Sequence, residues 1–315
     1  MLRHATAWLL LIVSGAAAAQ QSREDAWWTG PMLAANAATL PHGHALIEPY
    51  LFDIITTGHF DTSGNKHAGP REHDIGSLTY MLYGFTDDIT AGLIPRFFFD
   101  EPAGATNSSG VRFGDLTLQA AYGLTHFRDG GHTPDISIVL QQTLPTGSYD
   151  RLTRVSNGVG AGAYTTSLSL YLQHYFWMPN GRILRGRLDL TYGVSSSVSV
   201  QDQSVYGTVN GFSGRAWPGD SFTADAAAEY SLTRHWVLAL DVVYQHNEST
   251  RVMGTSAAGG ALEQHSGSSY SLGFAPAIEY NWTSRIGALL GVRIIEIGRN
   301  TSATITPAIA LNMVF

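Results

Sequence analysis

Charged side chains that recur at every second position of apolar segments are the residues of this chain with the clearest capacity for chemistry. Arg185, Arg187 and Asp189 share one parity of residues 183–195, while leucines fill much of the other parity. Residues two apart in a strand point to the same face, so these charges would line one side of it. Extending the pattern along the chain gives these candidates for an inward-facing charged set: Glu48, Arg96, Arg185, Arg187, Asp189, Asp225, Glu229, Asp241, Glu279 and Arg293. Buried charges of both signs either pair into salt bridges that rigidify the fold or line a polar path that selects solutes, and the two roles are compatible.

No constellation typical of an enzyme accompanies these charges. Residues 211–214 fall one residue short of the Gly-x-Ser-x-Gly nucleophile motif. The His-x-Ser spacing that a barrel phospholipase would carry on its lipid face does not occur in the sequence. Several histidines lie in loop-like segments without the spacing and glutamate of a helical zinc motif: His42, His44, His59, His67 and His73. We therefore predict no catalytic residue, no metal site, no cofactor and no enzymatic activity.

The composition narrows the class of protein further. Only 14% of the 315 residues are charged, against about 25% in an average soluble domain, while 44% are hydrophobic. A bundle of membrane helices needs runs of about 18 apolar residues, and beyond the N-terminal stretch the sequence has none. The chain has no cysteine, which excludes disulfides and thiolate chemistry, and its net charge of -7 without a basic run argues against nucleic acid as a partner.

The first 19 residues have the features of a cleaved signal peptide. Arg3 and His4 precede the apolar stretch 7–19, which ends in three alanines before Gln20. A membrane anchor is the weaker alternative, because about 20 apolar residues are needed to span a bilayer. We expect residues 1–19 to be removed and the mature chain to begin at Gln20, with no cysteine to carry a lipid.

Twelve segments of the mature chain alternate apolar residues with polar or small ones, as half-buried strands do. Each has about the length of a tilted strand that spans a bilayer, and they lie near residues 44–57, 74–85, 89–100, 115–124, 136–146, 167–178, 183–195, 221–232, 236–247, 269–282, 286–296 and 304–315. Their connections alternate strictly between short and long. The long ones are rich in Gly, Ser, Asn, Asp and Thr and lie near residues 58–73, 101–114, 147–166, 196–220 and 248–268.

This alternation is typical of bacterial outer-membrane barrels, in which short turns face the periplasm, long loops face outside and the strand number is even. We therefore predict an all-β fold, a transmembrane antiparallel up-and-down β-barrel of about 12 strands over residues 43–315. It would lie in the bacterial outer membrane with both termini in the periplasm. Phe315 ends the last strand as the C-terminal aromatic residue by which such barrels are recognised, so the expected partners are outer-membrane lipid and the barrel-assembly machinery. A soluble β-sandwich is the alternative, but it would carry Lys and Glu on its polar face.

Aromatic residues and the N-terminal segment refine this expectation. Many aromatic residues share the apolar parity near strand ends, where membrane girdles lie: Tyr80, Phe97, Phe99, Tyr122, Phe176, Tyr192, Phe222, Tyr230, Trp236, Tyr244, Tyr270, Tyr280 and Trp282. In the first two strands both parities are apolar enough to leave open which one faces the lipid.

Residues 20–42 lack a strand pattern but contain Trp27 and Trp28, which favour a buried or interfacial place. This segment is either a plug inside the lumen or a periplasmic tail.

Three stretches carry a resemblance to a known family: Trp28-Thr29-Gly30-Pro31, residues 44–50 with Ile47-Glu48-Pro49-Tyr50, and residues 300–315. Through them the chain resembles the bacterial outer-membrane transporters named for the meta-pathway of phenol degradation, over most of its mature length and most strongly at its two ends. That family is similar in outline to the uptake barrels for fatty acids and aromatic hydrocarbons. The resemblance thus implies passage of small, often hydrophobic or aromatic compounds.

The functional expectation is an outer-membrane channel that passively admits small organic solutes. The alternative is a barrel without transport, which would have a structural, adhesion or sensing role through its long loops.

Overall fold

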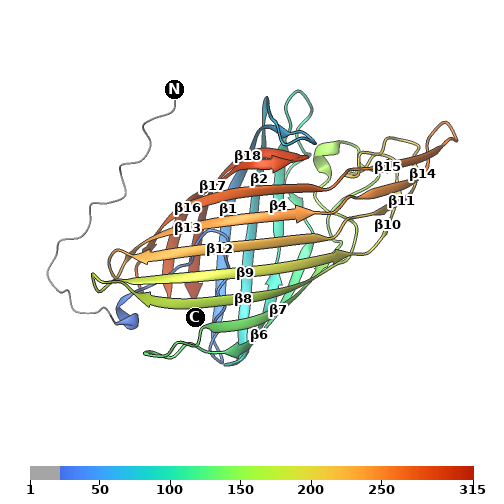
Figure 1. Ribbon diagram of the computed structural model, residues 1–315. Helices are drawn as coiled ribbons and strands as arrows, with labels where there is room; N and C mark the ends of the chain where they lie inside the picture. Colours follow the sequence, from blue (N-terminus) through green and yellow to red (C-terminus); the bar gives the residue numbers. More distant parts are fainter. Residues whose placement is uncertain (1–21) are drawn as a thin grey trace, which may run out of the picture.

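A computed structural model describes residues 22–315 and shows one closed antiparallel β-barrel (Figure 1). The predicted signal peptide, residues 1–19, lies outside the described residues. The barrel closes because β1 pairs with β2 on one side and with β18 on the other. Its strands are β1 (Ala45–Phe60), β2 (Lys66–Thr86), β3 (Ile89–Ile94), β4 (Arg96–Glu101), β5 (Arg112–Phe113), β6 (Leu116–Thr125), β7 (Asp135–Leu144), β8 (Thr165–Trp177), β9 (Ile183–Ser195), β12 (Ser221–Ser231), β13 (Trp236–Asn247), β16 (Ser269–Asn281), β17 (Ile286–Arg299) and β18 (Thr301–Val314).

The strand count confirms the predicted barrel. β3 and β4 are two halves of one strand and β5 leads into β6, so the 14 strands of the sheet make 12 crossings. The predicted single strand 89–100 is interrupted at Pro95, since proline has no N–H to donate to the ladder. The carbonyl of Pro95 still accepts a hydrogen bond from the Thr79 N–H at 3.2 Å, which keeps the two halves in line.

Helices contribute little to the fold. The described part of the chain contains two short 3₁₀ helices, η1 (Arg23–Asp25) and η2 (Val155–Asn157). Neither helix is long and apolar enough to cross a membrane.

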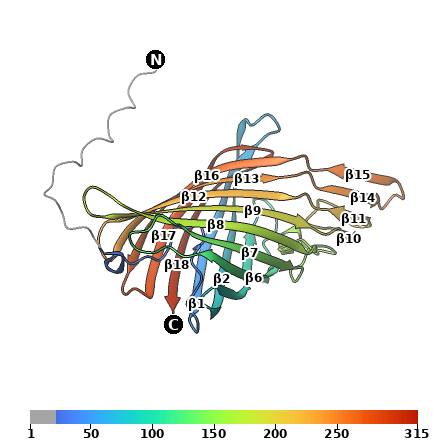
Figure 2. The ribbon, with the colours of Figure 1, turned by 60° about the horizontal axis from the view of Figure 1, so that its bottom comes forward.

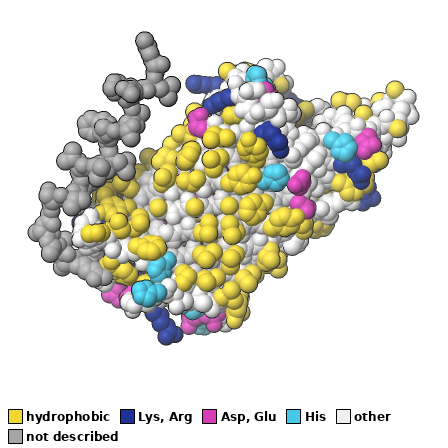
Figure 3. Space-filling model, viewed as in Figure 1, with side chains coloured by type: hydrophobic (Ala, Val, Ile, Leu, Met, Phe, Trp, Pro, Cys, Tyr) yellow, Lys and Arg dark blue, Asp and Glu magenta, His cyan; other side chains and the backbone are white. Residues whose placement is uncertain are grey.

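The outer surface of the barrel is apolar and the inner surface is polar, as predicted for a membrane barrel and opposite to a soluble sandwich. In β13, Leu238, Leu240 and Tyr244 are exposed, while Val237 and Asp241 on the other parity are buried. Figure 3 shows hydrophobic side chains spread over the middle of the wall and charged ones gathered toward its ends. A shift of one residue in the pairing of a strand would turn its apolar side chains to the inner face, so this alternation fixes the register of the sheet.

The two ends of the barrel differ, and we name them by their connections. At the turn end, short connections join β2 to β3, β8 to β9, β12 to β13 and β16 to β17. The chain also ends there, because Ala45 and Phe315 exchange backbone hydrogen bonds of 3.1 and 2.9 Å. At the opposite loop end lie the longer connections and one short turn, at Asn300 between β17 and β18, where the predicted alternation of short and long connections fails.

The prediction of irregular loops is wrong for two of the long connections, because together they form a second sheet. Residues 196–220 hold β10 (Val198–Gln201) and β11 (Ser213–Trp217), and residues 248–268 hold β14 (Arg251–Thr255) and β15 (Ala261–His265). The four strands project beyond the loop end of the barrel (Figures 1 and 2). They form because Val198, Val200 and Val252 alternate with polar residues and bury a small core with Phe212.

The predicted loop 58–73 is likewise mostly strand, since β1 and β2 continue past the barrel wall as a hairpin. Its turn is organised by Asp61, whose carboxylate accepts the N–H groups of Ser63 at 2.8 Å and Asn65 at 2.9 Å. The imidazole of His67 lies 2.9 Å from the other carboxylate oxygen. Gly64 takes the positive φ of 85° that completes the turn.

This hairpin is expected to loosen in acid. The hydrogen bonds from His67 and then Asn65 hold the pKa of Asp61 well below its usual range, because they favour the charged carboxylate. A lowered folded-state pKa gives stability that is present above the unfolded value of about 3.9 and is lost as the pH falls through the folded value. Hydrogen exchange of residues 61–65, corrected for intrinsic pH dependence, should accelerate below about pH 4. Constant protection down to pH 2, or the same pH dependence in Asp61→Asn, would contradict this.

Candidate functional site: the barrel lumen

Residues 27–42, which we call the lumen segment, cross the inside of the barrel. The backbone N–H of Trp27 donates to the carbonyl of Arg234, 3.2 Å away in the turn between β12 and β13. The N–H of His42 donates to Asp87, 2.9 Å away in the turn between β2 and β3. Both ends of the segment are therefore fixed at the turn end, and the residues between them loop through the lumen before β1 begins.

Inward-facing carboxylates hold the middle of the lumen segment by its backbone. Asp241 accepts the N–H groups of Met32, Leu33 and Ala34 at 3.0–3.3 Å. Asp189 accepts the next N–H, that of Ala35, at 2.6 Å. Successive N–H groups aimed at charged acceptors form stronger hydrogen bonds than neutral pairs do.

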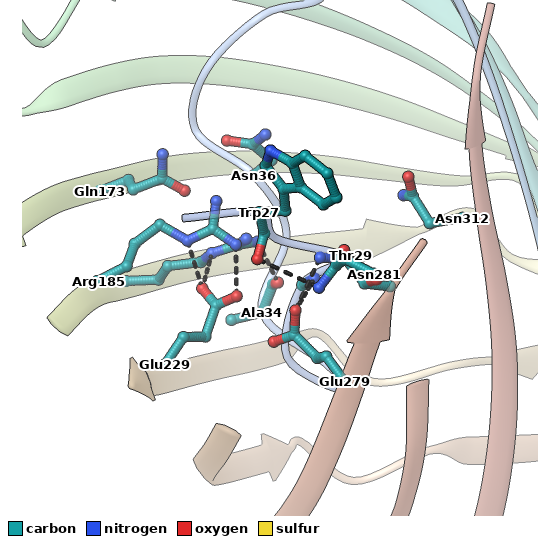
Figure 4. A network of polar contacts seen from close by, with 12 residues as sticks. Trp27, Thr29, Ala34, Asn36, Gln173, Arg185, Glu229, Glu279, Asn281 and Asn312 are labelled. Carbon is teal, nitrogen blue, oxygen red and sulfur yellow. Dashed lines mark hydrogen bonds and ion pairs between the residues drawn. The ribbon is translucent and has the colours of Figure 1, made fainter. Parts of the chain in front are cut away.

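Glu279 makes the same kind of contact nearer the start of the segment. Its carboxylate accepts the N–H groups of Thr29 at 2.7 Å and Gly30 at 3.1 Å (Figure 4). Asn281, also on β16, donates to the carbonyl of Trp27 at 3.1 Å and accepts from the Thr29 hydroxyl at 3.0 Å. The lumen segment is thus bound mainly through its main chain.

A buried ion-pair network lies beside these contacts. The carboxylate of Glu229 pairs with the guanidinium of Arg185, whose Nε donates at 2.7 Å, and with Nε of Arg187 at 2.9 Å (Figure 4). Arg187 also donates from Nη1 to the carbonyl of Ala34 at 2.9 Å, and the Arg185 guanidinium stacks 4.5 Å from the ring of Trp28. The network therefore connects the barrel wall to the lumen segment.

The structure brings most of the predicted charged set together around this segment. Glu48, Arg185, Arg187, Asp189, Asp225, Glu229, Asp241 and Glu279 are buried. Arg293 is partly buried, and its Nη2 donates to Gln245 at 2.6 Å. Arg96 lies apart on the opposite wall, where it is exposed and within electrostatic reach of Tyr80. In the described part of the chain, no group of three or more His, Cys, Asp or Glu side chains is arranged to hold a metal ion.

A cavity of about 340 Å³ lies between the lumen segment and one side of the barrel. Its wall includes the rings of Tyr50, Tyr80 and Tyr171, and the first two meet edge to face with centroids 6.1 Å apart. Phe52 and Phe98 continue this aromatic side, with their centroids 6.3 Å apart. The cavity also contains the buried Ser137 hydroxyl, which has no hydrogen-bond partner among the described residues.

Sequence patterns assigned one residue of this site to the wrong face. Tyr80 was predicted on the lipid-facing parity, but it is an inward residue that lines the cavity. The error arises because both faces of β2 are apolar, with Leu78 and Leu82 on the inside and Met81 and Tyr83 on the outside. Gly76 is the signal that could have corrected it, since a Cβ there would lie 2.2 Å from the ring of Phe52.

Comparisons with known proteins agree with this architecture. A family model described as "Putative MetA-pathway of phenol degradation" matches residues 72–306. The match lies between the two ends of the chain on which the sequence resemblance was strongest. No protein of curated function matches the chain.

Among the solved structures compared, one shares the fold and two others have lower similarity. The COG4313 outer membrane channel from Pseudomonas putida F1 is 17% identical, with 89% of this chain and 98% of that chain covered and a TM-score of 0.64. The beta domain of the Bordetella autotransporter BrkA is 11% identical, with coverages of 87% and 100% and a TM-score of 0.44. The Ralstonia pickettii toluene transporter TbuX is 9% identical, with coverages of 92% and 95% and a TM-score of 0.38.

Proposed function

This chain belongs to the MetA-pathway phenol-degradation family, and we propose that it is an outer-membrane channel for passive uptake of small aromatic solutes. The turn end faces the periplasm and the loop end faces outside, so both termini are periplasmic. The apolar outer wall contacts outer-membrane lipid, and Phe315 is the signal for the barrel-assembly machinery. The channel needs no cofactor and performs no reaction on the solute.

The aromatic-walled cavity is the single observation that carries this proposal. Its volume of about 340 Å³ falls in the range of small-molecule sites, and three tyrosine rings line it. Aromatic side chains bind aromatic ligands through edge-to-face and stacked contacts. The unpartnered Ser137 hydroxyl offers a hydrogen bond to a polar substituent, so a ring with one hydroxyl group suits the cavity.

The lumen segment is the gate in this proposal. It lies against the cavity and is held by hydrogen bonds rather than by strand pairing, so it can leave without unfolding the wall. Closed and open states then differ by whether residues 27–42 occupy the lumen. The charged set, Glu48, Arg96, Arg185, Arg187, Asp189, Asp225, Glu229, Asp241, Glu279 and Arg293, lines the solute path when the segment withdraws.

Single-channel recording of the refolded protein in a planar bilayer tests the proposal, with folding verified by heat-modifiable gel mobility. We expect stepwise currents that phenol reduces in a saturable way, while cyclohexanol, which has similar size but no aromatic ring, reduces them less. A folded protein that passes no current would contradict the channel function. It would favour a surface role for the sheet of β10, β11, β14 and β15, the second candidate.

Tyr80→Leu is expected to weaken the phenol block by about two- to ten-fold, since an aromatic pair contributes roughly 0.5–1.5 kcal/mol beyond its buried area. Tyr83→Leu is the matched control, because Tyr83 lies on the same strand but is exposed on the outer wall. The concentration of phenol that halves the current gives the comparison. Equal changes in the two variants would show that the cavity is not the binding site.

A further inference from the structure

Two carboxylates are opposed on the lumen wall, and neither forms an ion pair with a described residue. Asp189 on β9 and Asp225 on β12 are direct partners in the strand register. Side chains of directly opposed residues in an antiparallel pair approach closely, and like charges in such positions destabilise the sheet. Both residues are more than nine-tenths buried, with 7% and 5% of their surface exposed.

Each carboxylate has an oxygen that lacks a partner. Oδ1 of Asp189 and Oδ1 of Asp225 accept no hydrogen bond from any described residue. The other oxygen of Asp189 is engaged by the Ala35 N–H of the lumen segment. A buried carboxylate oxygen left without a donor or a counter-charge is costly, and either a bound cation or a proton offsets that cost.

The neighbouring arginines are committed elsewhere. Arg187 pairs with Glu229 and with the carbonyl of Ala34. Arg293 reaches over Gly273 toward β13 and donates to Gln245. Neither forms an ion pair with Asp189 or Asp225 in the described structure. Around the two carboxylates, Asp241, Glu229 and Glu279 add further negative charge, so carboxylates outnumber guanidinium groups on this side of the lumen.

Neutral oxygens surround the pair. Thr191 and Thr223 are the next opposed pair on the lumen face toward the loop end, and the Thr191 hydroxyl is hydrogen-bonded to that of Ser169 at 2.8 Å. Ca²⁺ sites combine several carboxylates with carbonyl and water oxygens, and no group of three or more acidic side chains among the described residues is arranged to hold a metal ion. A singly charged cation fits this set better.

We propose that Asp189 and Asp225 form a cation site on the lumen wall, which takes a monovalent metal ion or the ammonium group of an organic solute. The inference deepens the proposed function, because a site here makes the conducting lumen prefer cations over anions. It also places the site against the lumen segment, since Asp189 holds both the cation and the Ala35 N–H.

Reversal potentials in a KCl gradient test the selectivity. We expect wild-type currents to be cation-selective and Asp225→Asn to reduce the permeability ratio by about five-fold, the Boltzmann factor of one unit charge at about 4 Å in a watery lumen. Arg293→Gln should raise the ratio, because it removes an opposing positive charge. Asp220→Asn is the matched control, since Asp220 lies at the loop end beside Tyr192. An unchanged ratio in Asp225→Asn would overturn the proposal.

Binding is measured separately, so that failure of the channel function and failure of the site can be distinguished. The heat-modifiable gel transition of the full mature protein is followed at constant ionic strength while K⁺ or methylammonium replaces N-methylglucamine, a much bulkier monovalent cation. We expect K⁺ or methylammonium to raise the transition temperature of the wild type and of Asp220→Asn in a saturable way, and to leave Asp225→Asn unchanged. Stabilisation by both ions would identify the site as one for any small cation. Stabilisation by one ion alone would show whether the site takes a metal ion or an organic ammonium group. No ion-specific stabilisation of the wild type would mean that the two carboxylates share a proton, and would overturn the proposal even if the protein conducts.

Discussion

Replacing Asp241 with asparagine is expected to raise the open probability of the channel by between about ten-fold and a thousand-fold. The carboxylate accepts three consecutive N–H groups of the lumen segment, those of Met32, Leu33 and Ala34. Hydrogen bonds to a charged group contribute roughly 1.5–3 kcal/mol each, against about 1 kcal/mol for neutral ones. Asparagine keeps one oxygen and brings an NH₂ group toward the same donors. Each loss of about 1.4 kcal/mol in the free energy that holds the lumen segment in place raises the ratio of open to closed states about ten-fold.

The open probability is read from single-channel records at fixed voltage. Glu263→Gln is the matched control, because Glu263 lies on β15 with its side chain about half exposed and pairs only with His265 in the described structure. Deleting residues 27–38 gives the limiting case, in which the pore should stay open with a several-fold larger conductance. If the deletion variant is folded by gel mobility and its currents equal those of the wild type, the lumen segment is not the gate.

The barrel could be predicted because its strands obey a local rule. In β13 and β9 most outward residues are leucine, tyrosine or tryptophan, and the inward ones include Arg185, Arg187, Asp189 and Asp241, so a two-residue period is visible in the sequence. The positions of Arg185, Arg187 and Asp189 on the inner wall follow from that period alone. The same period places Pro95 within a strand. It does not show the break at Pro95, which arises because proline has no N–H to donate to the neighbouring strand.

The contacts of the lumen segment could not be predicted, since they use main-chain atoms. Met32, Leu33 and Ala34 are joined to Asp241 by N–H groups that every residue except proline has. Their side chains therefore carry no signal of this partner, which is more than 200 positions away in the chain. The sequence does contain the acceptor of each contact. This acceptor is an inward acidic residue with no basic residue opposite it on the neighbouring strands. Asp241 lies opposite Ala227 and Ala275 in the register, so a donor had to come from elsewhere.

The same reasoning separates the acids of the lumen into two roles. Asp241 accepts N–H groups of the lumen segment with both of its oxygens and Glu279 does so with Oε2, whereas Asp225 has no hydrogen bond to a described residue of that segment. Loss of Asp241 should therefore raise the open probability, whereas loss of Asp225, which holds no part of the segment, should change the ion preference with little effect on gating. Since the two residues lie on adjacent strands, comparing their asparagine variants distinguishes gate from selectivity within one wall of the barrel.

Glu229→Gln is expected to lower the free energy of unfolding by about 3–5 kcal/mol, because it leaves buried guanidinium groups without their counter-charge. Glu229 is fully buried and is the carboxylate shared by Arg185 and Arg187. Glu296→Gln is the matched control. It removes the ion pair with Lys66, which is 3.4 Å long and about half exposed, and exposed pairs contribute roughly 0–1 kcal/mol. Urea unfolding in lipid vesicles, followed by tryptophan fluorescence, measures both variants.

The double variant Arg185→Met/Glu229→Met decides what the network is for. Replacing a buried ion pair by apolar side chains of similar size is often neutral or stabilising, whereas removing one partner is costly. We therefore expect the double variant to recover part of the stability that Glu229→Gln loses, because only Arg187 is then left without its counter-charge, and Arg187 keeps its hydrogen bond to the carbonyl of Ala34. The cation–π contact of Arg185 with Trp28 disappears in this variant. If stability returns and the channel opens more often, the charges serve to hold the lumen segment in place. Equal losses in Glu229→Gln and Glu296→Gln would instead mean that the lumen is wet enough to screen the network, and that the buried ion pairs do not support the closed state.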